Sequence, residues 1–420
     1  MVTETEGVRT MKRFAFGLIA SVALGALAMA LAIPAARADQ FTTLLSFTDF
    51  SGANAFTDVN GTLYDTAEFG GSANAGTLFS YTPGSGSVQT LVSFPGRPNG
   101  AAPADHLTEV NGTLYGTTYN GGIETVGTMF SYTPGASSVQ TLFSFVGINF
   151  TGVNGALPEA RLIDINGTLY STTAEGGSAN LGTVFSYTPS SGSVQTLLSF
   201  TGPNGALPAA GFAAVNGTLY GTTQGGGSAG DGTVFSYTPG ASGVQTLASF
   251  TGANGISPLA RLIAVNGTLY GTTQGGGSAG DGTLFSYTPG ASGVQTLASF
   301  TGANGANPYA ALTDVNGTLY GATGFGGSAG DGTLFSYTPG ASGVQTLVTF
   351  TGANGANPVA TLTDVNGTLY GVAYSGGSAG DGTLFSYDTN APAPVPEPAS
   401  LALLGAGVVG LGVARRRRRG

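Results

Sequence analysis

One pentapeptide, Asn-Gly-Thr-Leu-Tyr, occurs seven times in this chain of 420 residues, and its regular spacing is the strongest constraint on the fold. Successive copies lie 51, 55, 50, 50, 50 and 50 residues apart. They begin at Asn60, Asn111, Asn166, Asn216, Asn266, Asn316 and Asn366. A period near fifty residues with strand-like content is typical of propellers and similar repeat arrays. The spacing therefore predicts an all-β protein built from seven similar units.

The fifth repeat shows how one unit is expected to fold. Two short apolar segments, 262–265 and 268–273, flank an Asn-Gly pair, which is a strong hairpin signal because both turn residues adopt positive φ. A Gly-rich connection leads to segment 283–288, and a Pro-Gly turn leads to segment 294–300; both segments are rich in strand-forming residues. Four antiparallel strands per repeat predict one blade of a propeller.

The two ends of the repeat array predict how the ring closes. The seventh repeat stops after its third strand, at Tyr387, and lacks a fourth. Segment 41–47 (FTTLLSF), at the start of the array, matches the missing strand in length and pattern. We therefore expect a seven-bladed β-propeller of four-stranded blades in which strand 41–47 completes the last blade and removes exposed sheet edges. An open β-solenoid is the alternative, but it would need polar caps, which this sequence lacks.

Residues 1–38 are predicted to be a secretory signal peptide. Two basic residues precede an apolar segment, and an Ala-Arg-Ala cleavage site ends at Ala38. The acidic residues before Met11 suit a signal peptide poorly, so Met11 is a candidate for the true start. The repeat domain would then occupy residues 39–389.

The mature chain is acidic and poor in charge. Residues 39–414 contain three arginines, no lysine and 19 acidic residues, which gives a net charge of −16. Nucleic acid and anionic lipid need clustered basic residues, so neither is expected as a partner. The chain has no Cys, which excludes disulfides and thiol chemistry.

The C-terminal region combines three features in a fixed order. A Pro-rich linker, 390–398, ends in the motif Pro396, Glu397 and Pro398, and residues 399–420 form a short hydrophobic helix followed by an arginine cluster. This arrangement resembles the PEP-CTERM sorting signal of Gram-negative bacteria. The resemblance implies transient insertion of the helix in the inner membrane, processing by an exosortase-type enzyme, and release to the cell surface or extracellular matrix. A plain single-pass tail anchor is the alternative.

The repeats resemble the GloVer tandem-repeat family of bacterial secreted proteins. The motifs that carry the resemblance are N-G-T-L-Y-G-T-T, G-G-S-A-G-D-G-T-L-F-S-Y, V-Q-T-L and F-T-G-A-N-G-A-N-P, within residues 41–387. The resemblance implies a secreted protein with one of several C-terminal anchors. It does not imply a reaction, because the family lacks a defining one.

Differences between the repeats indicate a candidate binding face. The only His and two of the three mature-chain arginines share one position, five residues before the turn Asn: His106, Arg161 and Arg261. Eight residues after the turn Asn, two repeats carry Tyr119 and Tyr374. Because variable loops on a rigid frame are where binding usually occurs, we expect these five residues to form a ligand site on one face. Neutral drift in tolerant loops is the alternative.

Two sets of acidic residues are expected to have mainly structural roles. One set stands in four identical Ser-Ala-Gly-Asp-Gly-Thr loops: Asp231, Asp281, Asp331 and Asp381. Asp-Gly favours turns through local side-chain hydrogen bonds, whereas one carboxylate per loop makes a weak Ca²⁺ site. The other set lies two residues before the turn Asn and is expected to cap the turn, or alternatively to form an acidic ring in the channel: Asp58, Glu109, Asp164, Asp314 and Asp364.

The sequence offers little for an enzyme active site. A Ser-His-Asp triad has only His106 available, although paired carboxylates among Asp105, Glu159 and Glu175 leave a carbohydrate-active enzyme as an alternative. We expect no catalytic residue, cofactor or metal. The preferred interpretation is a non-enzymatic, exported or surface-displayed propeller that binds exopolysaccharide or a protein partner through its variable loops. A structural matrix component without a specific ligand is the other alternative.

Overall fold

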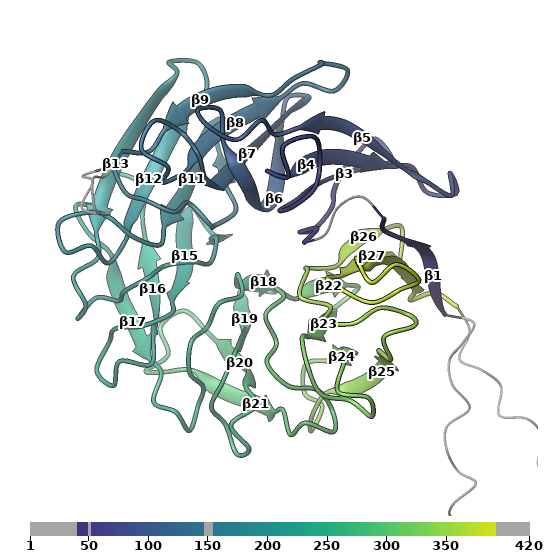
Figure 1. The fold of residues 1–420 in the computed structure, drawn as a ribbon. Coiled ribbons are helices and arrows are strands. Elements are labelled where there is room, and N and C mark those ends of the chain that lie inside the picture. The colour runs from purple at the N-terminus through teal and green to yellow at the C-terminus, as the bar shows by residue number, and fades with distance from the viewer. Residues whose placement is uncertain (1–39, 49–51, 147–153, 392–420) are drawn as a thin grey trace, which may run out of the picture. The chain divides into compact units, whose positions relative to one another are not determined.

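The computed structural model describes residues 40–48, 52–146 and 154–391. These residues form 28 strands in seven four-stranded antiparallel sheets, with no helix in the described part (Figure 1). The sheets are the blades of a β-propeller, and residues Gln40–Asn390 make up one compact unit. The predicted fold class is confirmed.

In blades 1 to 6 the strands are hydrogen-bonded in chain order from the innermost to the outermost, whereas in blade 7 the outermost strand comes from the start of the described chain. Blade 1 consists of β2 (Thr57–Val59), β3 (Thr62–Ala67), β4 (Thr77–Tyr81) and β5 (Val88–Ser93). Blade 2 consists of β6 (Ala101–Val110), β7 (Thr113–Asn120), β8 (Thr128–Tyr132) and β9 (Gln140–Ser144). Blade 3 consists of β10 (Ile163–Ile165), β11 (Thr168–Thr173), β12 (Thr183–Thr188) and β13 (Ser193–Ser199). Blade 4 consists of β14 (Ala213–Val215), β15 (Thr218–Thr223), β16 (Thr233–Tyr237) and β17 (Gln245–Ser249).

The remaining blades follow the same plan. Blade 5 consists of β18 (Ile263–Val265), β19 (Thr268–Thr273), β20 (Thr283–Tyr287) and β21 (Gln295–Ser299). Blade 6 consists of β22 (Thr313–Val315), β23 (Thr318–Thr323), β24 (Thr333–Tyr337) and β25 (Gln345–Thr349). Blade 7 consists of β26 (Thr363–Val365), β27 (Thr368–Ala373), β28 (Thr383–Asp388) and β1 (Phe41–Ser46).

The Asn-Gly pairs form the predicted hairpin turns between the first and second strands. In all seven turns the Asn has φ between 50° and 54° and the Gly has φ between 78° and 84°. A carboxylate two residues before the Asn accepts a hydrogen bond from the Gly N–H in five turns; the distance to Asp58 Oδ1, for example, is 2.8 Å. This confirms that the acidic residues at that position cap the turns.

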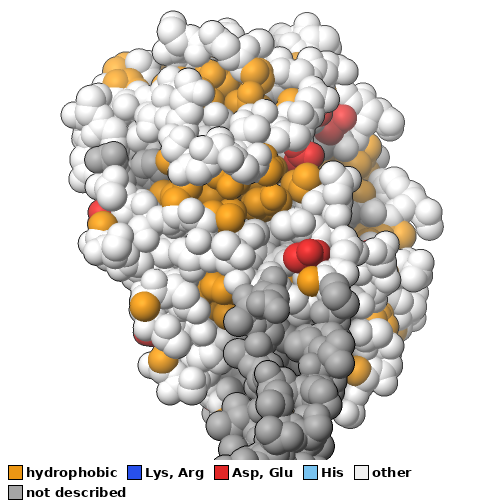
Figure 2. Space-filling model, turned by 90° about the vertical axis from the view of Figure 1, so that its right-hand side faces the viewer, with side chains coloured by type: hydrophobic (Ala, Val, Ile, Leu, Met, Phe, Trp, Pro, Cys, Tyr) orange, Lys and Arg blue, Asp and Glu red, His pale blue; other side chains and the backbone are white. Residues whose placement is uncertain are grey.

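The hydrophobic core lies mainly between neighbouring blades. Each cluster joins residues of two blades, as where Phe250 of blade 4 packs edge-on against Phe285 of blade 5, with ring centroids 5.0 Å apart. The third strands are almost fully buried, because Thr-Leu-Phe-Ser-Tyr segments pack on both faces. A hydrophobic band also reaches the surface on the side of the molecule near β1 (Figure 2).

Strand β1 closes the ring as predicted. It pairs antiparallel with β28, from Phe41↔Tyr387 to Ser46↔Thr383. The following residue, Phe47, is 2% exposed and packs against Phe79 of blade 1. The inner strands close the same junction, because the hydroxyl of Thr363 donates a 2.7 Å hydrogen bond to the carbonyl oxygen of Phe56.

The two faces of the propeller differ in their chain segments. The connections between blades lie beside the loops that join second and third strands, as shown by the hydrogen bonds from Ala156 N to Glu175 O (2.8 Å) and from Leu207 N to Leu181 O (2.9 Å). We call this side the loop face. The Asn-Gly and Pro-Gly turns lie at the opposite ends of the strands, on the side that we call the turn face.

Candidate functional site

The innermost strands bring equivalent positions of different blades together. Inner strands of neighbouring blades contact one another at six of the seven junctions. Threonine hydroxyls fix this arrangement: Thr57 Oγ1 donates to Leu107 O, and Thr108 Oγ1 donates to Leu162 O, both at 2.6 Å. Leu107 and Leu162 stand four residues before their turn Asn. The residues one position earlier, five before each turn Asn, line the cavities of the central channel.

His106, Arg161 and Arg261 line one cavity of about 460 Å³ in this channel. His106 lies on β6 and is 6% exposed, whereas the two arginines lie just before β10 and β18 and are half-buried. The structure therefore brings together the two arginines and the histidine that share a repeat position. The third mature-chain arginine, Arg97, lies elsewhere on the loop face, where it donates a 2.9 Å hydrogen bond to Ile123 O.

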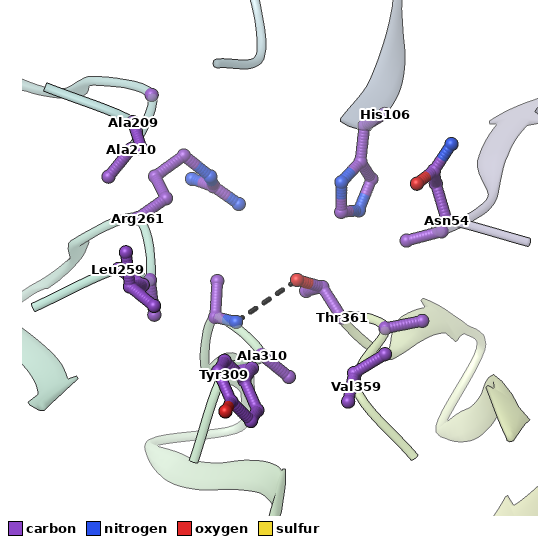
Figure 3. A pocket seen from close by; sticks show the side chains of 15 residues that line it. Asn54, His106, Ala209, Ala210, Leu259, Arg261, Tyr309, Ala310, Val359 and Thr361 are labelled. Atoms are coloured by element: carbon purple, nitrogen blue, oxygen red, sulfur yellow. Dashed lines mark hydrogen bonds between the residues drawn. The ribbon is translucent and has the colours of Figure 1, made fainter. Parts of the chain in front are cut away.

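A second cavity of about 200 Å³ adjoins the first, and small residues create it. Arg261 and His106 project into it from opposite sides (Figure 3), and Thr361 Oγ1 accepts a 3.1 Å hydrogen bond from Ala311 N. Gly211 keeps the space beside Arg161 open, because a Cβ there would lie 3.0 Å from the Arg161 carbonyl oxygen. The channel thus has room for a ligand group next to the cations.

Carboxylates occupy the same channel closer to the Asn-Gly turns. Four of the five turn-capping acids also line the 460 Å³ cavity: Asp58, Glu109, Asp314 and Asp364. Capping and channel lining are therefore compatible roles. The result is a channel with cations toward the loop face and carboxylates toward the turn face.

Tyr119 and Tyr374 belong to a different part of the loop face. Neither tyrosine lines the two channel cavities, and Tyr374 is 37% exposed. Gly52 lies against both Glu68 and Tyr374, because a Cβ on it would be 3.0 Å from Glu68 Cβ and 3.2 Å from Tyr374 Cε2. Burial raises the pKa of Tyr119, and Glu159, Glu175 and Glu68 raise it further. The five expected site residues therefore divide into a cationic group in the channel and an aromatic group among carboxylates.

Glu159 is a carboxyl group with a strongly raised pKa. Burial, and then the nearby Glu175 carboxylate, raise its pKa to about 7. The side chain of Asp105 lies outside the described residues.

The aspartates of the Asp-Gly loops act through their backbone. The carbonyl oxygens of Asp231, Asp281 and Asp331 accept hydrogen bonds of 2.8–3.0 Å from the connection to the next blade. In other repeats Ala75 and Val126 use their carbonyls in the same way, at 2.9 Å. This bond needs no particular side chain, and the turn role expected of the aspartate side chains stays a prediction. No group of three or more potential metal-binding side chains occurs among the described residues.

Sequence comparison alone missed a contact between blades that shapes the mouth of the channel. Gln274 Nε2 donates a 2.7 Å hydrogen bond to Tyr309 Oη. Gln274 stands eight residues after one turn Asn and Tyr309 stands seven before the next, so two variable positions of neighbouring blades meet. The signal in the sequence is the variability of the second position, where other repeats carry Glu159, Leu259 and Val359.

The described chain leaves the propeller at the turn face. Thr389 N donates to Gly367 O at 2.9 Å, and Asn390 Nδ2 donates to Asn366 O at 3.2 Å. Within the described residues there is no helix long and apolar enough to cross a membrane. The predicted signal peptide 1–38, the Pro-Glu-Pro motif and the hydrophobic helix of 399–420 lie outside the described residues.

Two solved structures are similar in fold at low sequence identity. A computationally designed protein, Ika8, matches at 14% identity with a TM-score of 0.49, over 82% of this chain and 99% of its own. A puromycin-hydrolysing peptidase of Mycobacterium tuberculosis matches at 12% identity with a TM-score of 0.52, over 81% of this chain and 51% of its own, so the present chain spans about half of that protein. At this identity the peptidase supports the fold alone. Comparison with curated proteins finds no match.

Two family descriptions match the sequence. A PEP-CTERM protein-sorting motif covers residues 394–419 and implies recognition by an exosortase-type enzyme, export, and a cell-surface or extracellular role in Gram-negative bacteria. The Gloeobacter/Verrucomicrobia repeat matches residues 33–230 and 210–393, which together include the whole propeller. The chain therefore belongs to the Gloeobacter/Verrucomicrobia repeat family.

Proposed function

We propose that this protein is a non-enzymatic surface propeller that binds an acidic extracellular polysaccharide at the cationic end of its channel. The observation that carries the proposal is the convergence of His106, Arg161 and Arg261 on one cavity of a domain with very few other cations. The sorting motif supports a location where such polymers occur.

The chemistry of the cavity favours a single carboxylate group. Arginine holds a carboxylate through two parallel hydrogen bonds, and partial burial of both guanidinium groups strengthens the attraction. The negative charge of the rest of the domain, including the carboxylates deeper in the channel, repels a long polyanion. The ligand group that fits is therefore a terminal or branch uronate at the loop face.

The test measures retention of the protein on immobilised polygalacturonate, with dextran as the neutral comparison. The Arg161→Ala, Arg261→Ala double variant should lose at least about tenfold in retention on polygalacturonate, because both bidentate partners are gone. Arg97→Ala is the matched control: it removes a loop-face arginine outside the channel and should leave retention unchanged.

Melting temperature and reducing-end release complete the experiment. A loss of retention is assigned to binding only if the double variant melts within about 3 °C of the parent. Unchanged retention in a folded double variant would refute the channel site. Release of reducing ends by the parent protein would instead favour the carbohydrate-active alternative, and retention on a protein ligand but on no polysaccharide would favour a protein partner.

A further inference from the structure

Grooves between neighbouring blades form a second type of cavity, and two of them are lined by equivalent residues. The groove between blades 4 and 5 measures about 430 Å³, and that between blades 1 and 2 about 480 Å³. Thr218, Tyr220, Ser236 and Gln245 of blade 4 face Tyr287 of blade 5 across the first groove. The corresponding residues of blades 1 and 2 line the second groove, with the same residue types.

A tyrosine pair recurs at every junction between blades. Each repeat has one tyrosine four residues after the turn Asn and another twenty-one residues after it, and the first meets the second of the next blade. The ring centroids are 6.1 Å apart for Tyr81 and Tyr370, 6.3 Å for Tyr115 and Tyr187, and 6.4 Å for Tyr320 and Tyr387. The seven pairs account for all but three of the 17 tyrosines, namely Tyr119, Tyr309 and Tyr374.

The groove walls carry polar groups that the fold does not use. Among the described residues, Thr218, Ser236 and Gln245 make no side-chain hydrogen bond to another residue, and neither groove is lined by a charged side chain. The two tyrosines of a groove are not equally accessible: Tyr287 and Tyr132 are 2% exposed, and the hydroxyl of Tyr287 donates a 3.3 Å hydrogen bond to Ala291 O, whereas Tyr220 and Tyr64 are half-buried. Each groove thus combines one partly accessible aromatic ring with hydroxyl and amide groups that make no side-chain hydrogen bond.

We propose that these inter-blade grooves bind neutral hexose units of a polysaccharide. A sugar ring presents an apolar C–H face, which packs on the half-buried tyrosine of the groove, Tyr220 or Tyr64, and hydroxyl groups, which hydrogen-bond to the Ser, Thr and Gln side chains. The groove volumes fall in the range of about 300–1,000 Å³ that is usual for small-molecule sites. The lack of charge in the lining selects against uronates, so this site differs in ligand from the channel and does not depend on it.

Repetition around the ring suits a polymeric ligand. Several weak sites that engage one chain raise the overall affinity without any new contact. The groove of blade 7 departs from the others, because β1 supplies Thr42 opposite Ser386 where blade 4 has Gln245 opposite Ser236. Binding there should be weaker than in the two grooves described above.

The test is a titration of the full protein, labelled with ¹³C at the tyrosine rings, with maltohexaose, cellohexaose and mannohexaose up to about 20 mM. Paired tyrosines should shift with at least one of these sugars, whereas Tyr119, Tyr309 and Tyr374 should not. If none of the paired tyrosines shifts with any of the three sugars, or if only the three unpaired tyrosines shift, the proposal is wrong.

A single variant supplies an internal control. Gln245→Ala changes an exposed side chain, and it should abolish the shift of Tyr220 and Tyr287 while the shift of Tyr64 and Tyr132 in the equivalent groove remains. Equal shifts at both grooves in this variant would contradict the assigned contact. A proline-rich peptide, which aromatic grooves can also bind, serves as the competitor; shifts with the peptide and none with the sugars would replace the saccharide by a peptide ligand.

Discussion

Replacement of Phe47 by alanine tests whether the junction between blades 7 and 1 is as firm as the others. Phe47 follows the closing strand β1 and is 2% exposed, and its ring lies 6.2 Å from that of Phe79 in blade 1. Its core cluster contains residues of both blades, among them Leu384 of blade 7 and Phe56 of blade 1. Phe47 is therefore a buried side chain that joins the N-terminal segment to the next blade.

The chain offers a matched control for this change. Phe250 occupies the equivalent position at the end of blade 4, is fully buried, and lies 5.0 Å from Phe285. Truncation of a buried phenylalanine costs about 3–5 kcal/mol, from lost burial and the cavity that remains. We expect about 4 kcal/mol for Phe250→Ala and about 3 kcal/mol for Phe47→Ala, whose ring contact is longer, and these values are large compared with a total stability of about 5–15 kcal/mol.

The assay is equilibrium urea unfolding, followed by both circular dichroism and tyrosine fluorescence. In a closed ring both variants should lower the midpoint of one shared transition. A third variant, Thr363→Val, removes the hydroxyl that bonds to Phe56 O and should cost about 1 kcal/mol. The reasoning is refuted if Phe250→Ala has its full effect while Phe47→Ala costs under about 1 kcal/mol or produces a separate early transition, because blade 7 would then not be held against blade 1.

Three further predictions concern pH, sorting and metal. The pKa of Glu159 is raised to about 7, so its stabilising contribution is complete below about pH 4.5 and lost as the pH rises to 7. At about 1.4 kcal/mol per pKa unit, the variant Glu159→Gln should be roughly 3 kcal/mol more stable than the parent at pH 8 and about equally stable at pH 4. Unfolding measured at both pH values checks this expectation. Mature protein from the native host should lack Arg415–Arg419, and an intact mass that includes them would favour a simple membrane anchor. A chelator should change the melting temperature little, and a drop of more than about 10 °C would show that calcium binds the aspartates of the four Asp-Gly loops: Asp231, Asp281, Asp331 and Asp381.

The architecture could be predicted because its determinants are local and repeated. Each Asn-Gly pair specifies a hairpin through the positive φ of two adjacent residues, and seven copies at nearly constant spacing specify the number of blades. Closure was predictable because the missing fourth strand of the last repeat has only one counterpart, segment 41–47. Strand ends shifted by one or two residues: β18 begins at Ile263 because Leu262 turns into the core instead of pairing.

The candidate site was predictable only in part. The position of a residue within its repeat does not say how far its side chain lies from the axis of the channel. Arg161 and Arg261 lie just ahead of the innermost strands, so their shared position implies convergence. Tyr119 and Tyr374 lie at or after the outer ends of second strands, farther along the blades, and a shared position there implies no contact with the cations. The backbone role of Asp231 was also hidden, since the partner of its carbonyl belongs to another blade.

The inter-blade grooves show why uniformity between repeats is an ambiguous signal. Identical residues at Tyr220 and Tyr287 are consistent with a scaffold when each repeat is considered alone. The two residues meet only when blades are placed side by side, and their 67-residue separation in the sequence gives no hint of the contact. A residue that both packs and binds a ligand is expected to be the same in every repeat, and so is a residue that only packs. Identity between repeats therefore does not distinguish the two roles, whereas neighbouring polar side chains without a hydrogen bond within the protein do.

The two proposed sites require different patterns of residues in the repeats, and they lie at different places in the propeller. A site for one carboxylate needs different residues from different blades at a single place, and only the channel axis brings all seven blades together. A site for a repeating neutral polymer needs the same residues many times, and only the junctions between blades occur seven times. Divergence at the position of Arg161 and constancy at the position of Tyr220 are therefore both expected of one protein that binds a neutral chain with acidic ends or branches. A polymer of that kind should be retained more strongly than either polygalacturonate or dextran, and equal retention of all three would show that the two sites do not act together.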